Sequence, residues 1–322
     1  MSDVNVVFIC SGNEVTGFGH VSRCLNIASG LARLLPAKQI HFYGDYGHFS
    51  KQKIAQAGFT RVEGLPAENL TDTLLIIDDY QITETSLKGY CNRGARLVII
   101  DDFDQFAFEC VDLIINFRFE AEKICQPTDK HLLGLDYLPV APSFEQLRKQ
   151  RLNNRSDNDI KSVLVFIGGT DRMNFAPTLL SCLDKVLHSK QIIWLTNQDV
   201  RLSLRNNQLT QVPYVDDMAE LYSSVDLVFS GGGLSKYEAG FCLLPNAAVS
   251  QTELQQDDTY VLAENALSFD LGLIGEVDEE ELIRRLTVFL TPDVIEQQRE
   301  AMVNAYRSDS TAKLAEKIFY LL

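Results

Sequence analysis

The sequence lacks any apolar stretch long enough to cross a membrane. Hydrophobic residues make up 46% of its 322 residues, but no run of about 18 apolar residues occurs. The amino-terminal residues Met-Ser-Asp-Val also lack the basic region and the apolar segment of a signal peptide. We therefore expect a globular protein without a membrane span that stays in the cytoplasm.

Positive charge is scarce in this chain. It has 29 Lys and Arg against 44 Asp and Glu, which gives a formal net charge of −15. A broad nucleic-acid surface needs a basic face that displaces counterions, so we expect no nucleic-acid partner. A polyanionic ligand would have to be held locally, by loops and helix N-termini.

Patterns typical of metal sites and disulfide frameworks are also missing. The seven cysteines are scattered without a Cys-x-x-Cys pair, and the five histidines form no His-x-x-x-His pair. This spacing favours reduced, mostly buried thiols. We expect no metal site and no cofactor.

The first chemically informative stretch is the loop at 12–24, Gly-Asn-Glu-Val-Thr-Gly-Phe-Gly-His-Val-Ser-Arg-Cys. It follows the apolar run 4–10 and leads into an apolar pattern of helical period, which predicts a strand, a turn and a helix in a parallel sheet. Gly17 and Gly19 allow the backbone to approach a bound group closely. The helix that follows directs its free N–H groups toward an anion.

His20 lies at the start of this predicted helix, at the strand end where open α/β sheets bind ligands. From the residues alone it is either a catalytic histidine or a surface residue of a plain turn. Ser22 stands where the dinucleotide fingerprint Gly-x-Gly-x-x-Gly requires its last glycine. This disfavours a nicotinamide-dependent oxidoreductase.

Acidic residues follow two further buried strands. The apolar run 73–78 ends in Asp78, Asp79 and Tyr80, and the run 97–101 ends in Asp101 and Asp102. Parallel strands bring these ends to the same sheet edge as His20. For Asp101 and Asp102 we expect helix capping or solvation in a loop.

The length of the chain predicts two domains. The stretch 138–159 has two prolines and then a polar run with few apolar anchors, which indicates an interdomain linker. We expect an N-terminal domain at 1–145, a linker at 146–160 and a C-terminal domain at 161–322, with the last helix a candidate to pack back on the first domain. The predicted fold class is α/β, with two Rossmann-like domains facing a central cleft.

A second glycine-rich loop lies in the C-terminal half. The strand at 225–230 opens into Gly231, Gly232 and Gly233, and a helix begins near Leu234. Three consecutive glycines cost backbone entropy that a purely structural turn could avoid with one. The loop therefore predicts phosphate binding at a helix N-terminus.

Taken in order, these fragments resemble a known group. They are Gly17-Phe-Gly-His20-Val-Ser-Arg23-Cys24, Asp78-Asp-Tyr80, Asp101-Asp102, Asp112 to Asn116, Tyr137, Gly168-Gly-Thr-Asp171 with Asn174, and Ser230-Gly-Gly-Gly-Leu-Ser235-Lys-Tyr-Glu238 with Pro245. Their order and spacing resemble the UDP-sugar hydrolases of pseudaminic acid biosynthesis and their spore-coat polysaccharide relatives, in the glycosyltransferase-B (GT-B) superfamily. The segment 212–238 is also similar to the nucleotide-binding domain of the undecaprenyl-pyrophosphoryl-muramoylpentapeptide N-acetylglucosaminyltransferase.

The resemblance implies roles for individual residues. His20 would activate the water that displaces the nucleoside diphosphate from C1, and Tyr80 would lie in the sugar pocket. Glu238 would accept hydrogen bonds from the ribose hydroxyls, the loop 231–235 would hold the diphosphate, and two glutamines would reach the diphosphate or the sugar. With His20 and Tyr80 as the catalytic candidates, the nucleotide-sugar-binding candidates are Gly17, Gly19, Gly169, Thr170, Met218, Gly231, Gly232, Gly233, Leu234, Ser235, Glu238, Gln255 and Gln256.

Two segments depart from the hydrolase pattern. The hydrolases carry Arg-x-Asp just before the first loop, where this chain has Ile9-Cys-Ser-Gly-Asn-Glu14, and their Asp-His-Tyr is here Asp78-Asp-Tyr80. Both differences fall on the sugar and acceptor side. We predict a metal-independent, inverting hydrolase of a nucleotide sugar, with a UDP-linked amino sugar as substrate, in surface polysaccharide or flagellin glycan biosynthesis. The alternatives are a GT-B glycosyltransferase with a sugar or lipid-linked acceptor, and a non-catalytic nucleotide-sugar-binding subunit.

Overall fold

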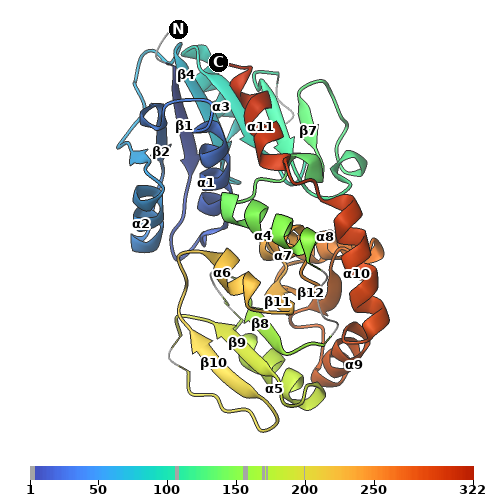
Figure 1. Cartoon of the computed structure of the whole chain (residues 1–322). Helices are drawn as coiled ribbons and strands as arrows, with labels where there is room; N and C mark the ends of the chain where they lie inside the picture. The colour runs from blue at the N-terminus through green and yellow to red at the C-terminus, as the bar shows by residue number, and fades with distance from the viewer. Residues whose placement is uncertain (1–3, 106–108, 155–158, 169–170, 172, 199) are drawn as a thin grey trace. The chain divides into compact units, whose positions relative to one another are not determined.

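The structure is a computed structural model that describes residues 4–105, 109–154, 159–168, 171, 173–198 and 200–322 (Figure 1). The chain divides into two compact units. The first unit is residues 1–142 together with 309–322, and the second unit is residues 143–308.

The first unit is built on a seven-stranded sheet with the order β3-β2-β1-β4-β5-β6-β7. All its neighbouring strands run parallel. The strands are β1 (Asn5–Cys10), β2 (Ile40–Tyr43), β3 (Thr60–Arg61), β4 (Thr73–Asp78), β5 (Arg96–Ile100), β6 (Leu113–Asn116) and β7 (His131–Leu133). The helices are α1 (Gly19–Leu31), α2 (His48–Gln56), α3 (Glu84–Asn92) and α11 (Ser310–Phe319), with the short helices η1 (Ala37–Gln39), η2 (Ala121–Lys123) and η3 (Leu135–Tyr137).

The second unit is built on a six-stranded sheet with the order β10-β9-β8-β11-β12-β13, again entirely parallel. Its strands are β8 (Ser162–Phe166), β9 (Gln191–Leu195), β10 (Gln208–Val212), β11 (Leu227–Gly231), β12 (Asn246–Ser250) and β13 (Phe269–Leu273). Its helices are α4 (Pro142–Asn153, all but its first residue), α5 (Ala176–Val186), α6 (Met218–Ser223), α7 (Ser235–Phe241), α8 (Glu253–Glu264), α9 (Glu279–Phe289) and α10 (Pro292–Ala305).

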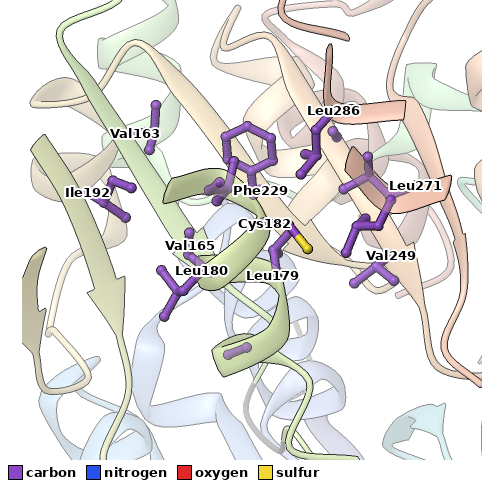
Figure 2. Packing of buried hydrophobic residues seen from close by; sticks show 14 of the residues in the cluster. Val163, Val165, Leu179, Leu180, Cys182, Ile192, Phe229, Val249, Leu271 and Leu286 are labelled. Carbon is purple, nitrogen blue, oxygen red and sulfur yellow. The ribbon is translucent and has the colours of Figure 1, made fainter. Parts of the chain in front are cut away.

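Continuous apolar runs form the central strands because helices cover both faces of a parallel sheet. All six residues of β4 are buried, and so are all five of β11. Figure 2 shows this packing in the second unit, where Phe229 of β11 lies among buried residues of the neighbouring strands and of α5 and α9. The alternation of strand and helix predicted these cores, and the fold class of two Rossmann-like α/β domains is confirmed.

The strand order reverses beside the first strand of each unit. In the first unit β1 has β2 on one side and β4 on the other, and in the second unit β8 has β9 on one side and β11 on the other. Loops at the carboxyl ends of such neighbouring strands splay apart and leave room for ligands. The glycine-rich loops predicted as ligand sites follow β1 and β11, so both lie at a switch point.

Part of the segment expected as a linker is helical. The range 146–160 begins inside α4, which packs onto the second unit through Arg148. The Arg148 guanidinium is buried and donates to the backbone oxygens of Phe241 at 2.8 Å and Tyr306 at 2.6 Å. Phe144 and Leu147 are the apolar side chains that this mostly polar helix buries beside Arg148, and two such positions give almost no apolar periodicity, which is why the sequence pattern did not indicate it.

The last helix, α11, belongs to the first unit and packs against α1. Gly30 of α1 permits this contact, because a Cβ there would lie 3.1 Å from the side chains of Thr311 and Ala315. Within the described residues, no helix has the length and apolar character needed to cross a bilayer.

Candidate functional site

His20 is paired with a carboxylate from a distant strand. Gly17 takes a left-handed backbone conformation with φ +74°, and α1 then begins at Gly19. This places His20 in the first turn of α1, where its Nδ1 lies 2.7 Å from Oδ1 of Asp78 at the end of β4. A carboxylate acceptor places the ring proton on Nδ1 and leaves Nε2 as the basic nitrogen. Among the described residues, no hydrogen bond engages Nε2, and the His20 side chain is 18% exposed.

Arg23 holds the carboxylate that holds His20. It lies three residues further along α1 and therefore on the same helix face. Its Nε and Nη2 donate to the two carboxylate oxygens of Asp78, both at 2.5 Å, and its Nη1 donates to Asp102 Oδ2 at 2.6 Å. Burial by itself would raise the pKa of Asp78, but Arg23 and His20 outweigh it and lower that pKa to about 2. Asp78 is therefore an ionised acceptor at neutral pH.

Tyr80 has a hydrogen-bonded hydroxyl and a partly exposed ring. Its hydroxyl donates to Oδ2 of Asp102, and burial of that hydroxyl raises the pKa of Tyr80 well above its usual value. Its ring meets the His20 ring edge to face, with centroids 4.7 Å apart, and the residue is 42% exposed. The arrangement suits a ring surface beside His20 better than an acid or a base. A catalytic role for Tyr80 stays a prediction.

Asp101 and Asp102 differ from what the sequence predicted. They are 2% and 6% exposed, so neither is solvated, and no described helix begins with them as caps. The Asp101 carboxylate accepts from the backbone N–H of Phe103, while Asp102 joins the Arg23 network. Buried carboxylates of this kind are stable only when charge partners or hydrogen bonds replace water.

In the second glycine-rich loop, close packing explains why two of the three positions are glycine. A Cβ on Gly231 would lie 2.4 Å from the backbone oxygen of Ile167, and one on Gly232 would lie 2.9 Å from Gln255 Cβ and Ser250 Oγ. Apart from its own chain neighbours, a Cβ on Gly233 would meet none of the described residues within 4 Å, and the same holds for a Cβ on Gly19 in the first loop. The local packing therefore leaves space at Gly19 and Gly233 that a ligand could use.

The helix that follows this loop carries one buried cation and one buried acid. Leu234 occupies the cap position and α7 starts at Ser235. The Lys236 ammonium turns inward, donating to the Gly232 carbonyl and lying 2.8 Å from Asp258 Oδ2, so it does not extend from the loop. Glu238 is 8% exposed, and burial raises its pKa to about 7.

The two adjacent glutamines point to different places. Gln255 lies beside Gly232, and its Oε1 accepts from the backbone N–H of Gln251 at 2.9 Å. Gln256 donates to Asp270 at 2.9 Å on the β13 side. The structure thus brings Gln255 to the glycine loop and directs Gln256 to β13.

The remaining predicted residues are placed as follows. Met218 is the first residue of α6 and is half-buried, behind the cap residue Asp217. Gly169 and Thr170 lie outside the described residues. Asp171 next to them caps α5, since its carboxylate accepts from the N–H groups of Phe175 and Ala176 at 2.9 and 2.8 Å.

Sequence reasoning gave no role to Arg23 or Lys236. The spacing of His20 and Arg23 signals one helix face, but the carboxylate that they share, Asp78, ends β4, and the second partner of Arg23, Asp102, follows β5. Only the folded sheet brings these groups together. In the described part of the chain, no group of three or more His, Cys, Asp or Glu side chains could hold a metal ion.

Two curated relatives are similar to this chain, although no protein-family model matches it. The spore coat polysaccharide biosynthesis protein SpsG of Bacillus subtilis is 24% identical over 308 residues, covering 88% of each protein. An uncharacterized protein of Methanocaldococcus jannaschii is 24% identical over 278 residues. That alignment covers 79% of this chain but 57% of the archaeal protein, so the chain spans a little over half of that relative.

Solved structures with similar folds include glycosyltransferases. MurG of Acinetobacter baumannii superposes with a TM-score of 0.67 at 13% identity, over 98% of this chain and 99% of MurG. The spinosyn forosaminyltransferase SpnP gives 0.67 at 15% identity over 99% of each chain. LpCGTa in complex with UDP gives 0.66 at 14% identity, over 98% of this chain and 99% of LpCGTa. At these identities the likeness establishes the fold, and the chain therefore has the two-domain α/β fold of the GT-B glycosyltransferases.

Proposed function

We propose that the chain is a metal-independent, inverting hydrolase of a UDP-linked amino sugar, with His20 as the general base. The observation that carries the proposal is the hydrogen bond of 2.7 Å between His20 Nδ1 and the ionised Asp78. This hydrogen bond leaves Nε2 as the nitrogen that can take a proton. The ring is partly exposed and lies at a switch point of the sheet.

The chemistry is a single displacement. Nε2 of His20 takes a proton from water as the water oxygen forms a bond to C1 of the sugar. The bond between C1 and the diphosphate oxygen breaks, and UDP leaves with that electron pair. Asp78 stabilises the imidazolium that forms, as a carboxylate does for a catalytic histidine. Attack opposite the leaving group inverts the configuration at C1.

The leaving nucleotide is assigned to the second unit. In this proposal the backbone amides of the loop 231–235 hold the diphosphate, Glu238 accepts from the ribose hydroxyls, and Gln255 completes the diphosphate site. The similarity to LpCGTa, which was solved with UDP, supports the nucleotide, and the similarity to SpsG supports a place in polysaccharide biosynthesis. The amino sugar, the pseudaminic acid pathway and a cytoplasmic location belong to the same proposal.

A glycosyltransferase is the second candidate, because solved structures of similar fold include the forosaminyltransferase SpnP. In that case His20 would deprotonate a hydroxyl of an acceptor instead of water. The deciding experiment incubates the protein with UDP-, CMP- and dTDP-sugars and a chelator, without acceptor. Release of UDP and an equal amount of inverted reducing sugar supports the hydrolase. Tight binding without release supports the transferase or a non-catalytic subunit, which an acceptor screen then separates.

Substitution of His20 tests the base directly. We expect His20→Ala to lower turnover by about 10²- to 10⁴-fold, because the water loses its proton acceptor, while UDP affinity stays within about twofold. Initial rates and calorimetric UDP titration measure the two effects. His188→Asn, at an exposed position of the second unit, is the matched control. Near-normal turnover in His20→Ala would remove His20 as the base.

A further inference from the structure

The Arg23 guanidinium serves two carboxylates at once. It binds Asp78 through Nε and Nη2, both at 2.5 Å, and Asp102 through Nη1 at 2.6 Å. Asp78 in turn binds His20 Nδ1 at 2.7 Å. Arg23 Nη2 also lies 3.3 Å from His20 Nδ1, so Asp102 is linked to His20 through Arg23 and Asp78. One guanidinium cation paired with two carboxylates leaves the three groups with a net negative charge.

The charge count extends to every element at this edge of the first unit's sheet. The buried charged side chains there are Arg23 of α1, Asp78 at the end of β4, Asp101 and Asp102 after β5, and Arg118 after β6. Arg118 reaches the edge by donating to the backbone oxygen of Asp102 at 2.9 Å. At formal charges, three carboxylates against two guanidinium groups leave one negative charge while the His20 ring is neutral. An imidazolium at His20 brings the count to zero.

The other titratable groups at this place do not alter the count. The Tyr80 hydroxyl donates to Asp102, and burial raises its pKa, so it stays neutral. The thiol of Cys24 lies 3.7 Å from Asp78 Oδ2, and burial raises its pKa as well. Both groups therefore contribute dipoles and no charge. The surplus depends on the carboxylates, and Asp102 is the one that does not touch His20.

We propose that Asp102 is a positioning residue of the His20 site: acting through Arg23, it supplies the surplus negative charge that the His20 imidazolium neutralises. Without Asp102 the guanidinium would belong to Asp78 alone, and proton uptake by His20 would create a net positive charge in a buried cluster. The inference deepens the proposed function, because it explains how a neutral histidine can become a cation during the displacement.

An isosteric variant can remove this charge with little change in geometry. In Asp102→Asn the amide oxygen can take the place of Oδ2 and keep the donors from Arg23 and Tyr80. The amide NH₂ then takes the place of Oδ1, which is buried and has no hydrogen-bond partner among the described residues. Asp79→Asn is the matched control. It makes the same change of net charge beside Asp78, and the Asp79 carboxylate accepts a local hydrogen bond from the N–H of Gln81 at 2.9 Å.

The test is an NMR titration of the histidine rings, with the His20 signal assigned by its loss in His20→Ala. In Asp102→Asn the midpoint of the His20 titration should fall by about one pH unit, because a negative charge near the cation is gone. The acid limb of kcat/KM should move in the same direction by a similar amount. Asp79→Asn should leave both unchanged. A His20 midpoint that stays in place or rises in Asp102→Asn would overturn the proposal.

Two further arrangements keep the test decisive. If Asp102→Asn does not fold, the carboxyl carbon of Asp102 is followed in the unsubstituted protein. It should keep the chemical shift of an ionised carboxylate while His20 titrates, and a protonated Asp102 would overturn the proposal. The ring titration needs no turnover. Absence of UDP release from every sugar would therefore contradict the proposed hydrolase function without contradicting the role of Asp102. If the protein hydrolyses a nucleotide sugar but the His20 midpoint does not move in Asp102→Asn, only the proposed role of Asp102 is contradicted.

Discussion

A single buried carboxyl, Glu238, makes the proposed nucleotide site sensitive to pH. Burial raises its pKa to about 7, and the ionised form accepts hydrogen bonds from two ribose hydroxyls better than the neutral acid does. Ligand binding that requires the ionised form strengthens as pH rises through that pKa. We expect UDP affinity to rise several-fold between about pH 6 and about pH 8, measured by isothermal titration calorimetry.

Glu238→Gln is the control for this pH dependence. The variant keeps the size of the side chain and removes the ionisation, so its UDP affinity should lose this pH-dependent rise. UDP itself gains charge near pH 6, by about the same amount for both proteins, and the comparison cancels that contribution. An equal pH dependence in the variant would show that Glu238 does not bind the nucleotide in its ionised form.

A titratable residue beside a local motif could be singled out in the sequence, whereas the partners that it contacts in the fold could not. His20 stands out because it follows a glycine-rich loop at a strand end, while the role expected for Glu238 came from the family resemblance. Arg23 and Asp102 have 78 residues between them in the sequence. Nothing in the sequence around either residue shows that the Arg23 guanidinium binds both Asp78 and Asp102. Local periodicity fixes which face a residue occupies, but the pairing of charges is decided by the order of the strands.

At the scale of elements, the loop from Gly231 to Gly233 separates a packing role from a ligand role. We expect Gly233→Ala to weaken UDP binding roughly tenfold or more, because its methyl group would enter the space that the diphosphate is proposed to occupy. The fold should be little affected, since in the described part of the chain no atom beyond the adjacent residues lies within 4 Å of that methyl position. Calorimetric UDP binding and the free energy of unfolding in urea measure the two effects.

Gly232→Ala is the comparison for Gly233→Ala. Its methyl group would collide with Gln255 and Ser250, so this variant should lose about 1–3 kcal/mol of stability as well as affinity. A Gly233→Ala protein with unchanged affinity would leave the loop without a ligand role. Loss of stability in Gly233→Ala equal to that in Gly232→Ala would mean that the glycine is structural after all.

Elements with long apolar runs could be predicted from the sequence, and short, interrupted or strongly charged elements could not. The apolar runs of β1, β4, β8 and β11 gave the two sheets and their helices. The strand β7 has three residues, and β13 is interrupted by Asp270 and Gly272, so neither shows a clear run. The helix α9 begins with three glutamates, and its three buried residues, Leu282, Leu286 and Phe289, have helical spacing that its charged residues obscure. Such elements form because a sheet already present offers them an edge or a face.

On the scale of the whole molecule, the chain returns to its first unit for its last helix. Ser310 donates to the backbone oxygen of Leu138 at 2.8 Å, and Thr311 accepts from the N–H of Val140 at 2.8 Å. Leu314 and Ile318 are fully buried in the same unit. The first unit is therefore assembled from two segments that lie far apart in the sequence. Its stability depends on residues that are translated after the entire second unit. The second unit, in contrast, is formed by one continuous segment.

Leu314→Ala tests whether the two units respond separately. The lost side chain is 0% exposed, so we expect the first unit to lose about 2–4 kcal/mol of unfolding free energy through the transfer and cavity costs. Tyr320→Ala near the end of the same helix is the control, because Tyr320 is 81% exposed and should change stability by less than about 0.5 kcal/mol. Hydrogen exchange resolves the effect, with faster exchange expected in α1 and β4 and unchanged exchange in β8 and β11. Equal acceleration in both sheets would mean that the two units unfold as one, and that the return of α11 stabilises the entire chain.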